Sequence, residues 1–239
     1  MKEITRFHQI DKTAFLSFPV LEKYNFLFHG LLLKTISNKD LKRFLKRAEL
    51  GDSSVLVPRQ IHSRKILTTN KKEKRRKIET SGYDGVLTDV TGIVLTVKVA
   101  DCLPIFLVDP VRKVIGLFHA GWRGTLMGIA REGVRKASQV FGSDPENLIL
   151  ILGPAIRSCC YEISESLAIL FPRDCLSFTN QKIKLDLVKA NLEQLLRSGV
   201  KRKKIFSSNL CTFCHKELFY SFRRDKVENK RMTAFIGIK

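Results

Sequence analysis

Long apolar runs are missing from the sequence of 239 residues. No run of about 18 apolar residues occurs, so no membrane-spanning helix is expected. Residues 1–18 contain no apolar signal core, and we therefore expect a cytoplasmic protein. In such a reducing compartment the six cysteines are expected to bind metal, take part in catalysis or lie buried as thiols, rather than form disulfides.

Several well-known binding motifs are missing as well. The chain contains no GxxxxGK[ST], no GxGxxG and no HExxH. Histidine is scarce, with five residues and no His-x-His pair, which are too few for a laccase-like array of several copper ions. Internal repeats, low-complexity tracts and linkers are also absent, so we expect residues 1–239 to form a single α/β domain.

Acidic residues are few, with 23 Asp and Glu against 43 Lys and Arg, and the net charge is +20. Such an excess could attract phosphate in a nucleotide or a nucleic acid. The basic residues are spread widely, however, and the densest run, Lys71–Lys77, is expected to be an exposed loop. The charge pattern therefore favours solvated faces over a nucleic-acid site.

A cysteine and a histidine stand at the two ends of a predicted β-hairpin within residues 99–123. Apolar runs at 103–108 and 114–118 flank Asp109-Pro110-Val111-Arg112, which is typical of a type I turn. If this four-residue turn sets the register, Cys102 faces His119 with Cβ atoms about 5 Å apart. A thiolate and an imidazole at that distance can share a metal ion or a proton.

His62, in a loop that follows a predicted strand, is the natural third member of this group. Two imidazoles and one thiolate suit zinc, and three protein ligands leave a position for a water whose pKa zinc lowers. Other interpretations stay open. Cys102 and His119 could be a metal-free nucleophile and base, the set also suits copper, with Met127 as the only candidate axial ligand, or the residues are unrelated.

The remaining cysteines carry weaker signals. Cys211–His215 matches the haem attachment pattern C-x-x-C-H, although haem c generally requires export. Cys159 and Cys160 are adjacent in sequence, and they could surround a structural zinc together with Cys211 and Cys214. A second C-x-x-C is missing, so this pattern is weak.

Leu126 to Phe141 trace one apolar stripe at helical spacing, with Thr125 as a candidate N-cap. The glycine-rich segment 121–124 therefore lies between a strand end and a helix start. Loops at such positions commonly carry function, and the start of a helix favours anions.

Six motifs stand in the order in which they occur in one known family. They are QIH at 60–62, DGVLT at 84–88, ADCLP at 100–104, HAGWRG at 119–124, GPAI at 153–156 with CCYE at 159–162, and CT at 211–212 with SFRRD at 221–225. Over about residues 55–239 the sequence resembles the YfiH-type family, long labelled polyphenol oxidase (laccase), with its laccase domain-containing relatives. Ser63 stands where glycine is usual in that family, and only Phe26–Gly30 matches its opening segment.

The resemblance implies a fold and an activity. The fold would be a single α/β (α+β) domain of mixed β-sheets flanked by helices, related to cysteine-hydrolase toxins. One zinc would be held by His62, Cys102 and His119. The activity would be phosphorolysis of purine nucleosides (adenosine, inosine or methylthioadenosine) and deamination of adenosine. The family is also credited with copper-dependent oxidation of polyphenols and with amidase editing of cell-wall precursors.

Two further residues receive roles on chemical grounds. Asp101, beside Cys102, is the nearest candidate for an acid or base, or it could orient a ligand histidine. Arg123, at a predicted helix start, is a candidate for holding phosphate, and Arg223 and Arg224 are second choices. The expected partners are thus a purine nucleoside and phosphate, with Cu²⁺ as the alternative to Zn²⁺; the oligomeric state cannot be predicted.

Overall fold

The computed structural model describes residues 4–34, 38–48, 50–51, 53–69, 79–179 and 181–239. The basic run Lys71–Lys77, predicted as an exposed loop, lies outside these described residues. The helices are α1 (Pro19–Glu22), α2 (Asn38–Arg47), α3 (Trp122–Met127), α4 (Ile129–Phe141), α5 (Glu165–Ala168), α6 (Leu187–Arg197) and α7 (Phe222–Asp225), with short 3₁₀ turns at Arg173–Cys175 and Arg202–Lys204. None of the described helices is long and apolar enough to cross a membrane.

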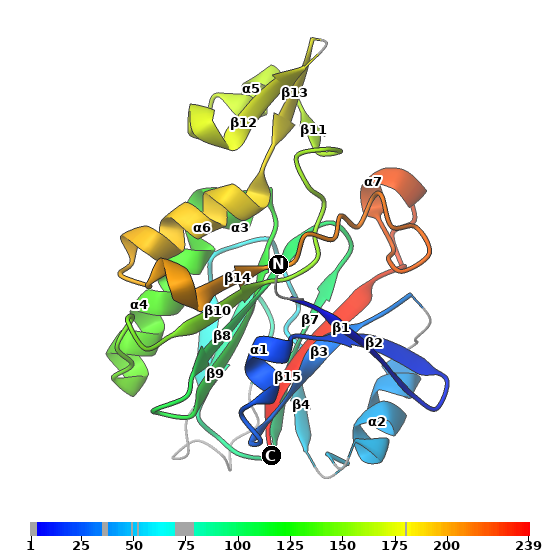
Figure 1. The fold of residues 1–239 in the computed structure, drawn as a ribbon, viewed down its shortest axis with the longest axis vertical. Coiled ribbons are helices and arrows are strands. Elements are labelled where there is room, and N and C mark those ends of the chain that lie inside the picture. Colours follow the sequence, from blue (N-terminus) through cyan, green and yellow to red (C-terminus); the bar gives the residue numbers. More distant parts are fainter. Residues whose placement is uncertain (1–3, 35–37, 49, 52, 70–78, 180) are drawn as a thin grey trace.

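The strands of the described residues form three sheets (Figure 1). The first sheet has the order β1 (Arg6–Ile10), β2 (Thr13–Ser17), β3 (Leu27–Leu32), β15 (Met232–Ile238), β7 (Ile93–Val99) and β4 (Ser54–Leu56). The second has the order β14 (Ile205–Ser207), β10 (Ile149–Leu152), β8 (Leu103–Asp109), β9 (Val114–Ala120), β6 (Gly85–Thr88) and β5 (Ile66–Thr69). The small third sheet contains β11 (Glu162–Ile163), β13 (Lys182–Leu185) and β12 (Leu176–Thr179).

Both large sheets mix parallel and antiparallel neighbours, and helices flank them, so the predicted α/β class with mixed sheets is confirmed. β4 runs parallel to β7, β5 to β6 and β14 to β10, whereas the other pairs are antiparallel. In Figure 1, α3, α4 and α6 lie together on one side of the second sheet, and the third sheet with α5 extends away from the two large sheets.

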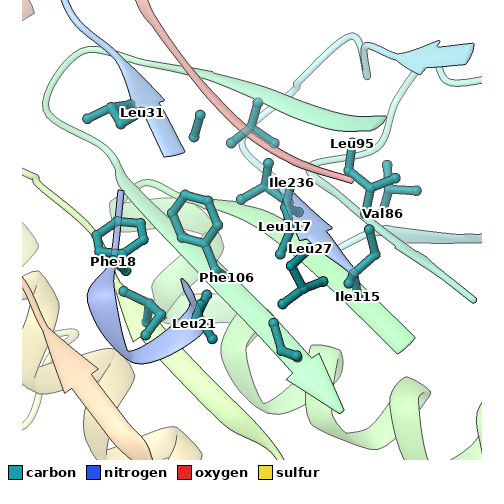
Figure 2. Packing of buried hydrophobic residues seen from close by; sticks show 14 of the residues in the cluster. Phe18, Leu21, Leu27, Leu31, Val86, Leu95, Phe106, Ile115, Leu117 and Ile236 are labelled. Carbon is teal, nitrogen blue, oxygen red and sulfur yellow. The ribbon is translucent and has the colours of Figure 1, made fainter. Parts of the chain in front are cut away.

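The period of two along each strand explains how the layers pack. In β8, Phe106 and Val108 face the first sheet, while Ile105 and Leu107 face α4 and α6. Figure 2 shows the core between the two large sheets, where Phe106 of the second sheet packs against Phe18, and Leu117 belongs to the same cluster as Leu95 and Ile236 of the first sheet. Strands that are buried on both faces consist of nearly continuous apolar residues. This shared core supports the prediction of a single domain, which stays a prediction.

The predicted register of the β8–β9 hairpin was wrong. Asp109 pairs with Val114, so His119 lies opposite Pro104, and Cys102 directly precedes the first residue of β8. The Asp109 carboxylate accepts hydrogen bonds from the backbone N–H groups of Val111 and Arg112, at 2.9 and 3.1 Å. Lys113 then adopts φ 54°, and this left-handed residue places the turn at 110–113 instead of 109–112.

The single helix predicted after the hairpin is in fact two. Gly128, with φ 85°, ends α3 and precedes α4, because a left-handed residue cannot continue an α-helix. Thr125 is therefore not an N-cap but lies within α3, where its backbone N–H donates to the Gly121 carbonyl at 2.8 Å. The break allows α3 to lie close to the loop that carries His62, since a Cβ on Gly124 would be only 3.0 Å from the Ser63 carbonyl oxygen.

Candidate functional site

His62, Cys102 and His119 come together where the two large sheets are joined. His62 lies in the connection between β4 and β5, Cys102 in the short connection from β7 to β8, and His119 in β9. One ligand atom from each residue lies within 4.8 Å of the others. The two rings lie 4.8 Å apart between centroids at 76°. His119 is buried, Cys102 is partly buried and His62 is exposed, so the group is open on one side.

Asp84, just before β6, holds two of these residues through one buried carboxylate. Its Oδ1 accepts from His119 Nδ1 at 2.9 Å and from the His62 backbone N–H at 2.9 Å. Its Oδ2 accepts from the Ser63 N–H at 2.6 Å, the Ser63 hydroxyl at 2.8 Å and the Ile61 N–H at 3.2 Å. A carboxylate only accepts, so Nδ1 of His119 carries its proton and Nε2 is left as the ligand or base.

The loop that carries His62 is fixed at a second point by Gln60. The Gln60 side chain donates to the Lys98 carbonyl at 2.9 Å and accepts from the Lys98 N–H at 2.8 Å, so it pairs with β7 like a short strand. These contacts hold His62 at φ 59°, a left-handed conformation that non-glycine residues adopt at a cost. The strain is compensated by the backbone hydrogen bonds to Asp84.

Gly121 leaves room for the group. A Cβ at this position would lie 3.0 Å from Cys102 Sγ and 3.1 Å from His62 Cδ2. Both distances are shorter than ordinary van der Waals contacts between such atoms. The glycine of the HAGWRG motif is therefore required for the close approach of the three side chains.

The charges of Cys102 and His119 depend on each other. Burial raises the pKa of the Cys102 thiol, but the charge of His119 and the hydrogen bonds of both histidines outweigh it and bring it from 9.0 to about 6. Burial lowers the pKa of His119, yet the Cys102 thiolate and Asp84 raise it from 6.5 to about 9. Without metal, the two side chains thus form a thiolate–imidazolium pair at neutral pH.

Two cavities meet at His62 and Cys102, and both are also lined by Ala100 and Phe222. The larger cavity has a volume of about 610 Å³ and adds Val57, Pro58, Arg59, Gln60, Lys98, His119 and Arg231. The aromatic cavity has a volume of about 240 Å³ and adds Asp101, Trp122, Arg123, Ile156, Tyr161, Leu187 and Arg223. The candidate site therefore has cations and aromatic faces on either side of the cysteine.

Asp101 lies beside the site but does not touch the histidines. Its buried carboxylate accepts from the Thr212 hydroxyl at 2.7 Å, the Ser221 hydroxyl at 3.0 Å and the Arg223 N–H at 2.7 Å. The expectation that Asp101 could orient a ligand histidine is wrong, because Asp84 makes that contact. Asp101, with φ 86°, joins the start of α7 to the turn that carries Cys102; acid or base catalysis by Asp101 stays a prediction.

The predicted arginines take different places. Arg123 is exposed in the first turn of α3, stacks 4.2 Å from the Trp122 ring and lines the aromatic cavity. Arg223 lines the same cavity, 5.1 Å from the Tyr161 ring. Arg224 instead donates to the carbonyls of Thr212, Phe213 and Phe219, so it holds the chain before α7 and has no place among the residues lining either cavity.

The donor set fits one tetrahedral metal ion. Zinc binds Cys sulfur and His nitrogen at about 2.0–2.3 Å, which places ligand atoms about 3.3–3.8 Å apart. The three candidate ligand atoms all lie within 4.8 Å of one another, so small movements of the side chains bring them to this spacing. Several copper ions do not fit. The other three histidines have separate contacts: His8 with the Ser17 hydroxyl, His29 with the Phe18 backbone and His215 with the Cys211 carbonyl.

Sequence reasoning missed Asp84, although it begins the DGVLT motif. The carboxylate stands just before β6, and nothing in the local pattern indicates that it accepts hydrogen bonds from residues 21 to 35 positions away. Tyr161 and Phe222 were likewise quoted only within motifs, and the structure brings both to the aromatic cavity.

The fold and the site together define an α/β protein with a Cys–His–His candidate metal centre, held by a buried aspartate at the junction of two mixed sheets. The family described as multi-copper polyphenol oxidoreductase laccase matches residues 33–239, and the chain belongs to this family. The predicted family membership is therefore confirmed.

Solved structures of the family share this fold. YlmD from Geobacillus stearothermophilus superimposes with a TM-score of 0.86 at 28% identity, covering 98% of each chain. The hypothetical protein YfiH of Bacillus licheniformis gives a TM-score of 0.85 at 27% identity, covering 98% of this chain and 99% of that one.

Curated relatives are similar over most of this chain. Bacillus subtilis purine nucleoside phosphorylase YlmD is 33% identical over 211 residues, covering 84% of this chain and 73% of the relative. Mouse purine nucleoside phosphorylase LACC1 is 30% identical over 214 residues, covering 86% of this chain. The chain spans about half the length of that mouse relative, namely 48%.

Proposed function

We propose that this chain is a metal-dependent purine nucleoside phosphorylase. Its substrates would be adenosine, inosine or methylthioadenosine, and the same site would also deaminate adenosine. The observation that carries the proposal is the aromatic cavity beside Cys102, where Trp122, Tyr161 and Phe222 accompany two arginines. Relatives that are 30–36% identical and named purine nucleoside phosphorylases support the same activity.

The chemistry of phosphorolysis fits the groups that line the two cavities. In that reaction a phosphate oxygen forms a bond to C1′ of the ribose while the bond from C1′ to the purine nitrogen breaks. Flat aromatic faces suit the purine, and Trp122 and Phe222 provide them. Arg123 is our candidate for binding phosphate, because a guanidinium can donate two parallel hydrogen bonds to phosphate oxygens.

His62, Cys102 and His119 would hold the metal. A bound Zn²⁺ with three protein ligands supplies a Lewis acid and lowers the pKa of a coordinated water, which is the chemistry that deamination needs. Asp84 would keep Nε2 of His119 unprotonated and directed at the ion. Zinc is favoured over copper because Met127, the only candidate for an axial copper ligand, lies at the end of α3 and is 40% exposed. Binding of Cu²⁺ at the same site, with oxidation of polyphenols as the activity, remains the alternative.

One observation favours a second candidate, an amidase of the kind that edits cell-wall precursors. Cys102, His119 and Asp84 form a chain of nucleophile, base and carboxylate. The pKa of Cys102, lowered to about 6, provides the thiolate that attacks an amide carbon. In this case the reaction would need no metal.

The free state of all six cysteines supports our proposal that the enzyme acts in the cytoplasm, where thiols stay reduced. The phosphate dependence of adenosine consumption tests the function itself. We expect adenine and ribose 1-phosphate only when phosphate is added, and inosine from deamination without it.

Variants and a second substrate complete this test. Cys102→Ala should lower product formation at least about 100-fold, since even partners of metal ligands are worth about 10–100-fold. Cys175→Ala, which changes a cysteine outside the site, is the matched control. Release of an amino acid from a muropeptide nucleotide, with adenosine left intact and chelators without effect, would replace the proposal by the amidase.

A further inference from the structure

Four cysteines that the candidate site does not use form a cluster of their own. Cys159 and Cys160 follow β10, and Cys211 and Cys214 follow β14. Their four sulfur atoms all lie within 4.8 Å of one another. Two segments about fifty residues apart in sequence therefore bring every one of their thiols to a single point.

The spacing fits one tetrahedral ion. With Zn–S bonds of about 2.3 Å, the sulfur atoms of a tetrathiolate site are about 3.8 Å apart. The sulfur of Cys214 lies 3.8 Å from that of Cys159 and 3.3 Å from that of Cys160. A disulfide joins two sulfur atoms at about 2.05 Å. Two disulfides would therefore not need all four sulfur atoms to surround a single point, whereas one metal ion does.

The backbone around Cys211 is arranged for a thiolate. Burial raises the pKa of the Cys211 thiol, but the backbone N–H groups of Arg157, Cys214 and Phe213 outweigh it and lower that pKa, whereas burial raises the pKa of Cys159 and of Cys160. Two of these donors lie within the C-x-x-C turn itself, so the turn is wrapped around its first sulfur. Backbone N–H groups directed at sulfur favour the charged form that a metal ion requires.

The surroundings compensate negative charge. The Lys184 ammonium donates to the Cys159 carbonyl at 2.7 Å, next to the cluster. The Arg157 guanidinium, bound to the Ser208 carbonyl at 3.0 Å, joins the same two segments from within. Cys211 is 4% exposed, which disfavours the haem attachment suggested by the C-x-x-C-H pattern.

We propose that Cys159, Cys160, Cys211 and Cys214 bind one Zn²⁺ in a closed tetrathiolate site that is separate from the His62–Cys102–His119 group. Four protein ligands leave no position for a substrate, so the site is structural. It fastens the segment before Tyr161 to the segment that leads to α7, and Tyr161 and the α7 residues Phe222 and Arg223 line the aromatic cavity. The proposal does not depend on the proposed activity.

Metal counting on the full chain tests the proposal. The protein is purified with a reductant, saturated with Zn²⁺ and dialysed, and zinc per chain is measured by mass spectrometry of the metal. We expect Cys214→Ser and Cys160→Ser each to bind one equivalent less than the unchanged chain. Cys175→Ala, which changes the cysteine that belongs to neither metal site, should lose no zinc. His62→Ala should lose the other equivalent, and His62→Ala with Cys214→Ser should lose both.

A second measurement needs no cysteine variant. In the His62→Ala chain, bound Co²⁺ should give the strong near-ultraviolet sulfur-to-cobalt absorption and the visible bands of a tetrahedral tetrathiolate, and these should vanish when Zn²⁺ is added. The proposal is overturned if Cys214→Ser keeps the full zinc content. It is also overturned if His62→Ala is folded yet binds no Co²⁺, or if the reduced and metal-saturated chain has a Cys160–Cys214 disulfide by peptide mapping.

Discussion

Replacing Asp84 by asparagine changes one atom in the buried carboxylate that supports the candidate metal site. The carboxylate accepts five hydrogen bonds: three from backbone N–H groups, one from the Ser63 hydroxyl and one from the ring N–H of His119. An amide keeps one accepting oxygen, and its NH₂ group must face N–H groups on the other side. With the NH₂ group in place of Oδ2, the N–H groups of Ile61 and Ser63 lose their acceptor, and neither can turn away.

The loss of stability can be worked out from these contacts. Each buried donor without a partner costs about 1–3 kcal/mol, and His119 loses one of the two negative charges that raise its pKa, the other being the Cys102 thiolate. We therefore expect Asp84→Asn to lower the free energy of unfolding by about 3–5 kcal/mol. Zinc affinity should fall about 10–100-fold, because the acceptor that fixes the Nδ1 proton of His119 is weakened.

Urea denaturation and zinc competition against a chelator measure the two effects. Asp174→Asn is the matched control, since the Asp174 side chain is exposed and its carboxylate lies 3.6 Å from the Lys189 ammonium at the surface. The control should change the free energy of unfolding by less than about 0.5 kcal/mol. If Asp84→Asn has the urea midpoint and zinc affinity of the unchanged chain, the carboxylate does not have the role assigned to it.

Three other outcomes follow from single contacts. Gly121→Ala should weaken zinc binding at least about tenfold, because its methyl group would lie 3.0 Å from Cys102 Sγ. Gly92→Ala, at φ 73° and with open space around it, should lower only the free energy of unfolding, by about 1 kcal/mol. Chelator competition and urea denaturation measure the two effects, and equal zinc affinities of the two variants would contradict the role of Gly121. Burial lowers the pKa of His29 to about 4, so the unfolded chain binds its proton more readily, and about 3 kcal/mol of stability should be lost as the pH falls from 6.5 to 4. His29→Gln should remove this part of the pH profile in urea melts, and parallel profiles for the two proteins would refute the argument. Arg123→Ala should raise the KM for phosphate more than that for the nucleoside, and unchanged phosphate dependence in initial-rate assays would exclude Arg123 as the phosphate ligand.

Local patterns were enough to predict the central hairpin of the second sheet. The apolar runs on either side of Asp109 became β8 and β9, which are neighbours in that sheet. Such strands are buried on both faces, so their composition alone identifies them. The hairpin register could not be predicted in the same way, because it depended on whether Lys113 would adopt a left-handed conformation.

The nature of the site was readable from residue types, whereas its support was not. A cysteine and two histidines near strand ends indicate a thiolate and imidazole centre whatever the register, and the structure brings the three together even though the expected facing of Cys102 and His119 is wrong. The support comes from Asp84, which contacts the loop at 61–63 and β9 across the fold. Contacts of this kind depend on how distant segments pack, and neither spacing nor propensity encodes them locally.

The amino-acid sequence by itself therefore determined the class of fold, the family and the donor atoms available for chemistry, since these follow from short-range periodicity and from motifs that each occupy a few residues. Tertiary structure alone decided which carboxylate serves the histidines, which aromatic side chains face the cysteine and how four further thiols meet. The physical reason is that burial and hydrogen bonding between segments far apart in the chain exist only after the two sheets have packed against each other.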